Sequence, residues 1–168
     1  MKIFELFDIE PRFVVDAALL KNKWLQLSKQ YHPDYLQQAT EWEQADALQT
    51  LAEINKAYKL LQNKTQLIEY ILSEKGIIQA GEKQSIEPQF LASVMDANEQ
   101  LADAEFEGDT AAQQEIFSEL EQTNHELETS MAAIFKKTVA SCTQEELLQI
   151  KQYLFHKKYL ARILERKI

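Results

Sequence analysis

The stretch LSKQYHPDYLQ, residues 27–37, places a proline between two segments that have the pattern of helices. A residue that precedes proline is pushed away from helical dihedral angles, so the first helix must end before Pro33. We predict that this helix begins at Asp16, which is a common N-cap residue type. Its apolar stripe recurs at spacings of four, three and four residues and consists of Leu20, Trp24, Leu27 and Tyr31.

Two further helices are expected after the proline. Thr40 and Glu43 have the spacing of a capping box. The stripe of the helix that they start consists of Leu48, Leu51, Ile54, Tyr58 and Leu61. A short third helix opens at Asn63 and can be closed by Gly76 in a left-handed conformation. Two amphipathic helices joined by a short loop pack as an antiparallel hairpin, which is the arrangement predicted for residues 1–75.

The remainder of the chain is predicted to be a separate helical bundle. Residues 76–88 contain two of the three glycines and one of the three prolines, which indicates a linker. Three segments with coiled-coil spacing follow, and they begin near Phe90, Asp109 and Thr143. We therefore predict an all-α protein with a helical hairpin in residues 1–75, a linker in 76–87 and an antiparallel three-helix bundle in 88–168.

Composition narrows the function classes. The chain has 168 residues and a formal net charge of −9. Binding to a phosphate backbone needs clustered Lys and Arg. We therefore expect protein partners and no nucleic acid. The single cysteine, Cys142, has no neighbours at metal-ligand spacing, so no metal or cofactor is expected. Neither a signal peptide nor an apolar run of membrane-spanning length is present, so a cytoplasmic protein without membrane contact is expected.

The tripeptide His32-Pro33-Asp34 admits three interpretations: a base with its orienting acid, a turn that stops a helix, or a displayed contact for a partner. Catalysis is disfavoured because no nucleophile or phosphate-binding glycine loop accompanies the pair. A simple turn explains the proline but requires neither the histidine nor the aspartate. The displayed contact explains all three, together with Lys21, Lys23 and Lys29 on the preceding helix.

With that basic helix before it and INKAYKLL, residues 54–61, after it, QYHPD resembles the J-domain of DnaJ-type co-chaperones. A J-domain followed by an acidic bundle that includes FLASVMDANEQLADAE, residues 90–105, is similar to the HscB family, co-chaperones of bacterial iron–sulfur cluster assembly. The resemblance covers essentially the whole chain. One departure is Leu67, which stands where an arginine is usual three residues before Tyr70.

The resemblance implies two partners and no enzymatic activity of the chain itself. The first is an ATP-hydrolysing chaperone of the DnaK type, HscA, whose implied contacts are His32, Pro33, Asp34, Lys21, Lys23 and Lys29. The second is the cluster scaffold protein IscU, whose implied contacts are Leu91, Met95, Asp96, Glu99, Asp103 and Tyr153. Ala92 stands where relatives can have a larger apolar residue.

Several alternatives remain open at this level. Leu91 and Met95 lie off the Phe90/Val94 seam and could form a docking surface, but they could also widen the core stripe. Tyr153 could equally be a core residue. The bundle could serve other clients of a J-domain protein, or its seams could mediate homodimerisation in a structural protein. A monomer is expected.

Overall fold

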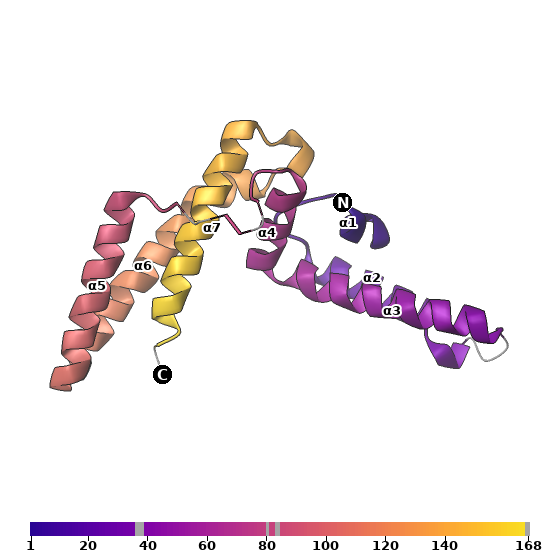
Figure 1. The fold of residues 1–168 in the computed structure, drawn as a ribbon, viewed down its shortest axis with the longest axis horizontal. Coiled ribbons are helices and arrows are strands. Elements are labelled where there is room, and N and C mark those ends of the chain that lie inside the picture. Colours follow the sequence, from indigo (N-terminus) through magenta and orange to yellow (C-terminus); the bar gives the residue numbers. More distant parts are fainter. Residues whose placement is uncertain (36–38, 80, 83–84, 167–168) are drawn as a thin grey trace. The chain divides into compact units, whose positions relative to one another are not determined.

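The computed structural model describes residues 1–35, 39–79, 81, 82 and 85–166, and its regular elements there are helices (Figure 1). The α-helices are α1 (Lys2–Leu6), α2 (Ala17–Gln30), α3 (Glu41–Gln62), α4 (Lys64–Glu74), α5 (Pro88–Glu107), α6 (Thr110–Phe135) and α7 (Gln144–Leu164). Single 3₁₀ turns occupy Pro33–Tyr35 and Val139–Ser141. The predicted all-α class is confirmed.

Contacts divide the chain into two compact units. Unit 1 consists of Met1–Lys75 and Phe135–Cys142, and unit 2 of Gly76–Ile134 and Thr143–Ile168. In the part of the chain that the structure describes, no helix is both long enough and apolar enough to span a bilayer.

The predicted helix starts form as expected. Asp16 accepts a hydrogen bond from the Leu19 N–H at 2.7 Å, and Asn63 caps α4 in the same way. Complete capping boxes start α3 at Thr40 and α7 at Thr143. Each cap satisfies N–H groups that have no partner within the helix, so these polar side chains fix where the helices begin.

Unit 1 is held by the α2–α3 hairpin (Figure 1). The Trp24 ring stacks on Tyr58 with centroids 4.8 Å apart, and its indole N–H donates to the Asn55 side-chain oxygen at 2.8 Å. One predicted stripe residue is wrong, because Leu48 is 59% exposed and Ala47 is buried in its place. The largest fully buried side chains of this unit are Phe4, Phe7, Phe13, Leu20, Ile54, Leu67, Ile68, Ile71 and Leu72.

Residues 135–142 belong to unit 1, although they are distant from it in the sequence. The Val139 N–H donates to the Pro11 carbonyl at 2.9 Å, and Arg12 forms an isolated β-bridge with Thr138. The Phe135 ring packs against Phe13 with centroids 6.0 Å apart. The sequence-based division placed these residues in the C-terminal domain; its boundaries stay a prediction.

Unit 2 is a bundle of α5, α6 and α7. One apolar cluster within it consists of Val94, Leu101, Ala104, Ile116, Phe117, Leu120, Leu160 and Ile163. Gly108, at φ 71°, ends α5 in the left-handed conformation, and Asp109 then accepts hydrogen bonds from the first N–H groups of α6 at 3.0 Å. Near the end of α7, Leu160 and Ile163 are buried while Ala161 is exposed.

The predicted linker is partly described, since residues 80, 83 and 84 lie outside the described ranges. The Lys151 ammonium donates to the Ile77 carbonyl at 3.0 Å and to the Glu82 carboxylate. The hydrogen bond from Lys151 lowers the pKa of Glu82. The described part of this segment is therefore tied to α7 within unit 2.

A buried histidine lies between α7 and the first turn of α5. The His156 ring is 9% exposed and stacks on Phe90 with centroids 3.9 Å apart. Burial lowers the pKa of His156, and the nearby Glu87 carboxylate opposes that shift. Its Nε2 atom is buried and has no hydrogen-bond partner among the described residues, so a proton added there would be poorly solvated.

We predict that acid destabilises unit 2 through His156. The folded-state pKa lies below the unfolded value of about 6.5, so the unfolded chain binds the proton first and stability falls as pH drops through that value. The free energy of unfolding, followed by far-UV circular dichroism in urea, should decrease between about pH 7 and about pH 5.

The substitution His156→Phe keeps an aromatic ring against Phe90 and removes the titration, so it should flatten this pH dependence. His125→Gln, at an exposed histidine of α6, should leave it unchanged. An equally steep decrease in the His156→Phe variant would assign the acid sensitivity to other groups.

Candidate functional site

The His32-Pro33-Asp34 tripeptide lies in the turn between α2 and α3. The Tyr31 N–H closes α2 with a hydrogen bond to the Leu27 carbonyl at 3.1 Å, and Pro33 then starts a 3₁₀ turn. Pro33 fixes its own φ and has no N–H to leave unpaired, so it both ends the helix and stiffens the turn. All three residues of the tripeptide are exposed.

Hydrogen bonds within the turn use the histidine and leave the aspartate free to face outward. The Asp34 N–H donates to His32 Nδ1 at 3.2 Å, and the Tyr35 N–H donates to the His32 carbonyl at 3.0 Å. A ring nitrogen that accepts this hydrogen bond carries no proton, so it does not donate to the Asp34 carboxylate 3.6 Å away. This differs from a catalytic pair, in which the acid receives that N–H. The Asp34 side chain is 77% exposed.

No role was predicted for Tyr35 from the sequence, but the structure places its ring beside the tripeptide. The ring meets His32 edge-on with centroids 6.2 Å apart, and the Lys29 ammonium lies 5.7 Å from its centroid. Tyr35 is 65% exposed, so it adds apolar surface next to Asp34. Its position directly after the tripeptide is the one signal that could have identified it.

The predicted basic face of α2 contains two of its three lysines. Lys21 and Lys29 are exposed, and they lie about 80° apart around the helix. Lys23 lies well away from both, because two residues correspond to about 200° of rotation. Its ammonium forms an ion pair with the Asp8 carboxylate at 2.9 Å. Lys23 therefore does not share a face with the other two.

A second candidate site is the outer face of α5. Met95 is 54% exposed, which favours the docking surface over the core stripe for this residue, while Leu91 is partly buried beside the buried Val94. The acidic residues predicted to surround them, Asp96, Glu99 and Asp103, are all exposed. This face therefore combines an accessible apolar side chain with carboxylates, as a transient protein interface does.

The opposite flank of that helix is occupied by Arg166, two residues beyond the end of α7 (Gln144–Leu164). Arg166 donates to the Asn98 side-chain oxygen at 2.7 Å and to the Glu105 carboxylate. Among the described side chains, no group of three or more His, Cys, Asp or Glu residues could hold a metal ion.

Comparisons with known proteins identify the family to which this chain is similar. A family model described as the HSCB C-terminal oligomerisation domain matches residues 86–166. The Co-chaperone protein HscB homolog of Vibrio vulnificus is 32% identical over 146 residues, which are 86% of this chain and 80% of that protein. The homolog of Colwellia psychrerythraea is 33% identical and covers 94% of this chain and 91% of its own length.

The chain belongs to the HscB co-chaperone family. Two solved structures of the family are similar to it throughout. Chaperone HscB from Vibrio cholerae has a TM-score of 0.73 at 27% identity and covers 99% of this chain and 94% of its own. The human co-chaperone protein HscB has a TM-score of 0.76 at 28% identity and covers 98% and 79%. The fold is thus a J-domain joined to the C-terminal helical domain of HscB proteins.

Two positions of this HscB-family chain lie in the core. Tyr153, implied as a client contact, is 4% exposed, and its hydroxyl donates to the Glu128 carboxylate at 2.8 Å. Burial, followed by that carboxylate, raises the pKa of Tyr153. Tyr153 therefore occupies a core position. It can support a docking surface only by holding α6 and α7 together. Leu67, at the position where an arginine is usual, is 1% exposed and offers no contact surface.

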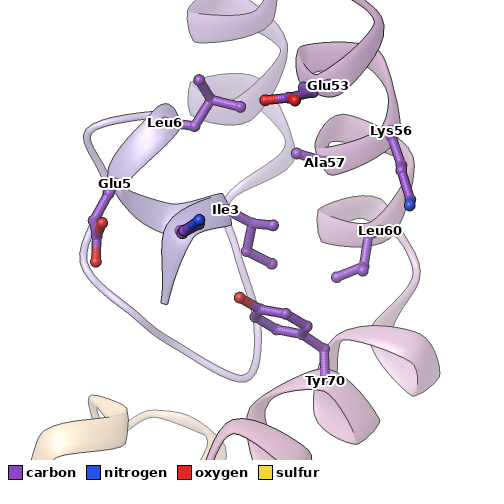
Figure 2. A pocket seen from close by; sticks show the side chains of 9 residues that line it. Ile3, Glu5, Leu6, Glu53, Lys56, Ala57, Leu60 and Tyr70 are labelled. Carbon is purple, nitrogen blue, oxygen red and sulfur yellow. The ribbon is translucent and has the colours of Figure 1, made fainter. Parts of the chain in front are cut away.

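Unit 1 also contains an apolar pocket of about 740 Å³ between α1, α3 and α4. Figure 2 shows Ile3 and Leu6 of α1 on one side, Ala57 and Leu60 of α3 on the other, and Tyr70 of α4 at one end. Burial and the Glu74 carboxylate raise the pKa of Tyr70, which keeps its phenol protonated. None of the predicted site residues is among those that line this pocket.

We predict that Tyr153→Phe destabilises unit 2 by about 1 kcal/mol, the usual contribution of one hydrogen bond. Glu128 keeps its ion pair with Lys157, at 2.9 Å, so the carboxylate is not left alone. Urea unfolding followed by circular dichroism measures the change. The matched control is Tyr159→Phe, at a partly buried tyrosine of the same helix, α7. Equal losses in the two variants would count against a specific role of the Glu128 bond.

Proposed function

We propose that this chain is a co-chaperone of iron–sulfur cluster assembly in the cytoplasm. It would bring the scaffold protein IscU to the DnaK-type chaperone HscA and stimulate ATP hydrolysis by that chaperone. The observation that carries the proposal is the exposed His32-Pro33-Asp34 turn, whose internal hydrogen bonds hold it rigid while the Asp34 carboxylate faces outward. The chain's relatives are named co-chaperones, which supports the same role.

Asp34 is suited to pair with an arginine of the ATPase, because a charge-assisted hydrogen bond is about twice as strong as a neutral one. Such a contact can stimulate hydrolysis only if it forms better in one conformation of the ATPase than in the other. His32 and Pro33 hold the aspartate in place. Lys21 and Lys29 add positive charge that would increase the association rate with an acidic patch.

The outer face of α5 is suited to hold the scaffold protein. Met95 offers an exposed apolar side chain, and Leu91 lies one turn before it on the same helix. Small apolar clusters within a polar rim supply most of the energy in many transient interfaces. A J-domain protein with a different client would use the same surfaces, so the identity of the client has to be tested directly.

Carrying both surfaces on one chain has a simple thermodynamic advantage. Once the scaffold protein is bound at α5, the chaperone that binds the J-domain meets it at an effective concentration set by the connection between the two units. Delivery of the client is then coupled to stimulation of the ATPase without any catalysis by this chain.

We predict that His32→Gln or Asp34→Asn removes most of the stimulation of the chaperone ATPase. A hydrogen bond to a charged group contributes about 1.5–3 kcal/mol, so the loss should be about tenfold or more at sub-saturating concentration. Steady-state phosphate release by the purified chaperone measures it. Because both side chains are exposed, the variants should retain the circular dichroism spectrum of the native chain.

Glu145→Gln is the control, since it removes an exposed carboxylate of α7, outside unit 1. It should stimulate normally. Normal stimulation by the two tripeptide variants would show that the turn is not the contact and would overturn the proposal.

We also predict that the double substitution Leu91→Ala/Met95→Ala weakens binding of the scaffold protein by about tenfold or more, as loss of an interface hot spot does. Isothermal titration calorimetry measures the Kd with the full chain. Stimulation of the chaperone ATPase in the absence of client should persist, because the substitutions lie outside unit 1. An unchanged Kd would move the docking site away from α5.

A further inference from the structure

Phe106, in the last turn of α5, is the most exposed large apolar side chain among the described residues, at 94%. Single exposed apolar residues are common on protein surfaces and by themselves indicate nothing. Phe106, however, lies on the same helix as the proposed docking surface. Whether it can belong to that surface depends on which face of α5 carries its ring.

Helix geometry places Phe106 on the face of Met95. Eleven residues separate them, which corresponds to a rotation of about 20° and a rise of about 16 Å along the axis. The exposed Ala102 lies between them, also about 20° from Met95. An apolar stripe therefore starts at the partly buried Leu91 and runs through Met95 and Ala102 to Phe106.

The two flanks of this stripe differ in chemistry. On one flank Arg166, two residues beyond the end of α7, donates to Asn98 and Glu105, so that side is closed by the bundle itself. On the other flank lie the exposed acidic residues Asp96, Glu99, Asp103 and Glu107. Within the described part of the chain, these four carboxylates form no ion pair. The whole of α5 contains no Lys, Arg or His.

We propose that the stripe from Leu91 to Phe106 is one continuous docking surface, with Phe106 as its distal anchor. Its occupant is a protein segment that presents Lys or Arg side chains along one edge and an apolar depression for the Phe106 ring. This rests on the proposed function, in which the scaffold protein binds α5, and it extends that surface by three turns of helix.

Charge complementarity selects this occupant over a second copy of the chain. If α5 packed antiparallel against the same face of another copy, it would bring two rows of unpaired carboxylates together, and like charges across an interface are costly. A basic partner instead gives each carboxylate a counter-charge at the edge of the interface. The aromatic ring supplies apolar contact area at low cost in side-chain entropy.

The test is the Kd of the purified scaffold protein for the full chain and for Phe106→Ala, measured by calorimetry at low and high salt. We expect Phe106→Ala to weaken binding by about tenfold, as an aromatic anchor does. Added salt should weaken the binding of the scaffold protein both to the native chain and to the Phe106→Ala variant. The variant should unfold as the native chain does, because the ring is 94% exposed. Leu148→Ala, at a 48% exposed leucine of α7, is the matched control and should bind normally.

The outcomes separate this inference from the proposed function. A Phe106→Ala variant that binds within a factor of about two of the native chain, while Leu91→Ala/Met95→Ala binds weakly, would remove Phe106 from the interface and leave the proposed function intact. If neither variant changes the Kd, docking on α5 fails altogether. If Phe106→Ala changes the solution mass in light scattering and not the Kd, a second copy covers the stripe and the inference is wrong.

Discussion

Proline at position 33 is the constraint on which unit 1 depends. Without it, the apolar spacing of α2 would allow one long helix to continue, because nothing else in residues 27–35 forbids helical dihedral angles. With the helix ended, the chain reverses and α3 packs against α2, where the Trp24 ring stacks on Tyr58. The same break leaves a short rigid turn at the end of the hairpin. Pro33 therefore causes both the reversal of the chain into the α2–α3 hairpin and the exposure of the tripeptide in the turn.

The turn divides its polar groups between two tasks. His32 turns its Nδ1 and its carbonyl inward to accept backbone N–H groups, which satisfies donors that the break in the helix would otherwise leave open. The Asp34 carboxylate faces outward. A histidine–aspartate pair two residues apart suggests acid–base chemistry in sequence alone. The direction of a single hydrogen bond separates that arrangement from a displayed contact.

The sequence predicted what depends on local chemistry and missed what depends on neighbours. Helix starts were predicted correctly because a capping side chain bonds within its own turn. On α3, periodicity predicted an apolar stripe but could not show which edge of that stripe faces other helices. Leu48 was therefore assigned to the core in place of Ala47. Periodicity also could not show that the Lys23 ammonium pairs with Asp8 or that the Tyr153 hydroxyl donates to Glu128, because both partners are distant in sequence.

The acidic side chains along one flank of α5 destabilise that helix in the free chain. Glu99, Asp103 and Glu107 follow one another at intervals of four residues, and a like-charge pair at that spacing destabilises a helix by about 0.2–0.5 kcal/mol. No cation within α5 offsets this repulsion. A basic partner would relieve it on binding, so the same charges that weaken the free helix strengthen the complex. The carboxylates thus lower the stability of the free helix and favour a partner of opposite charge over other partners.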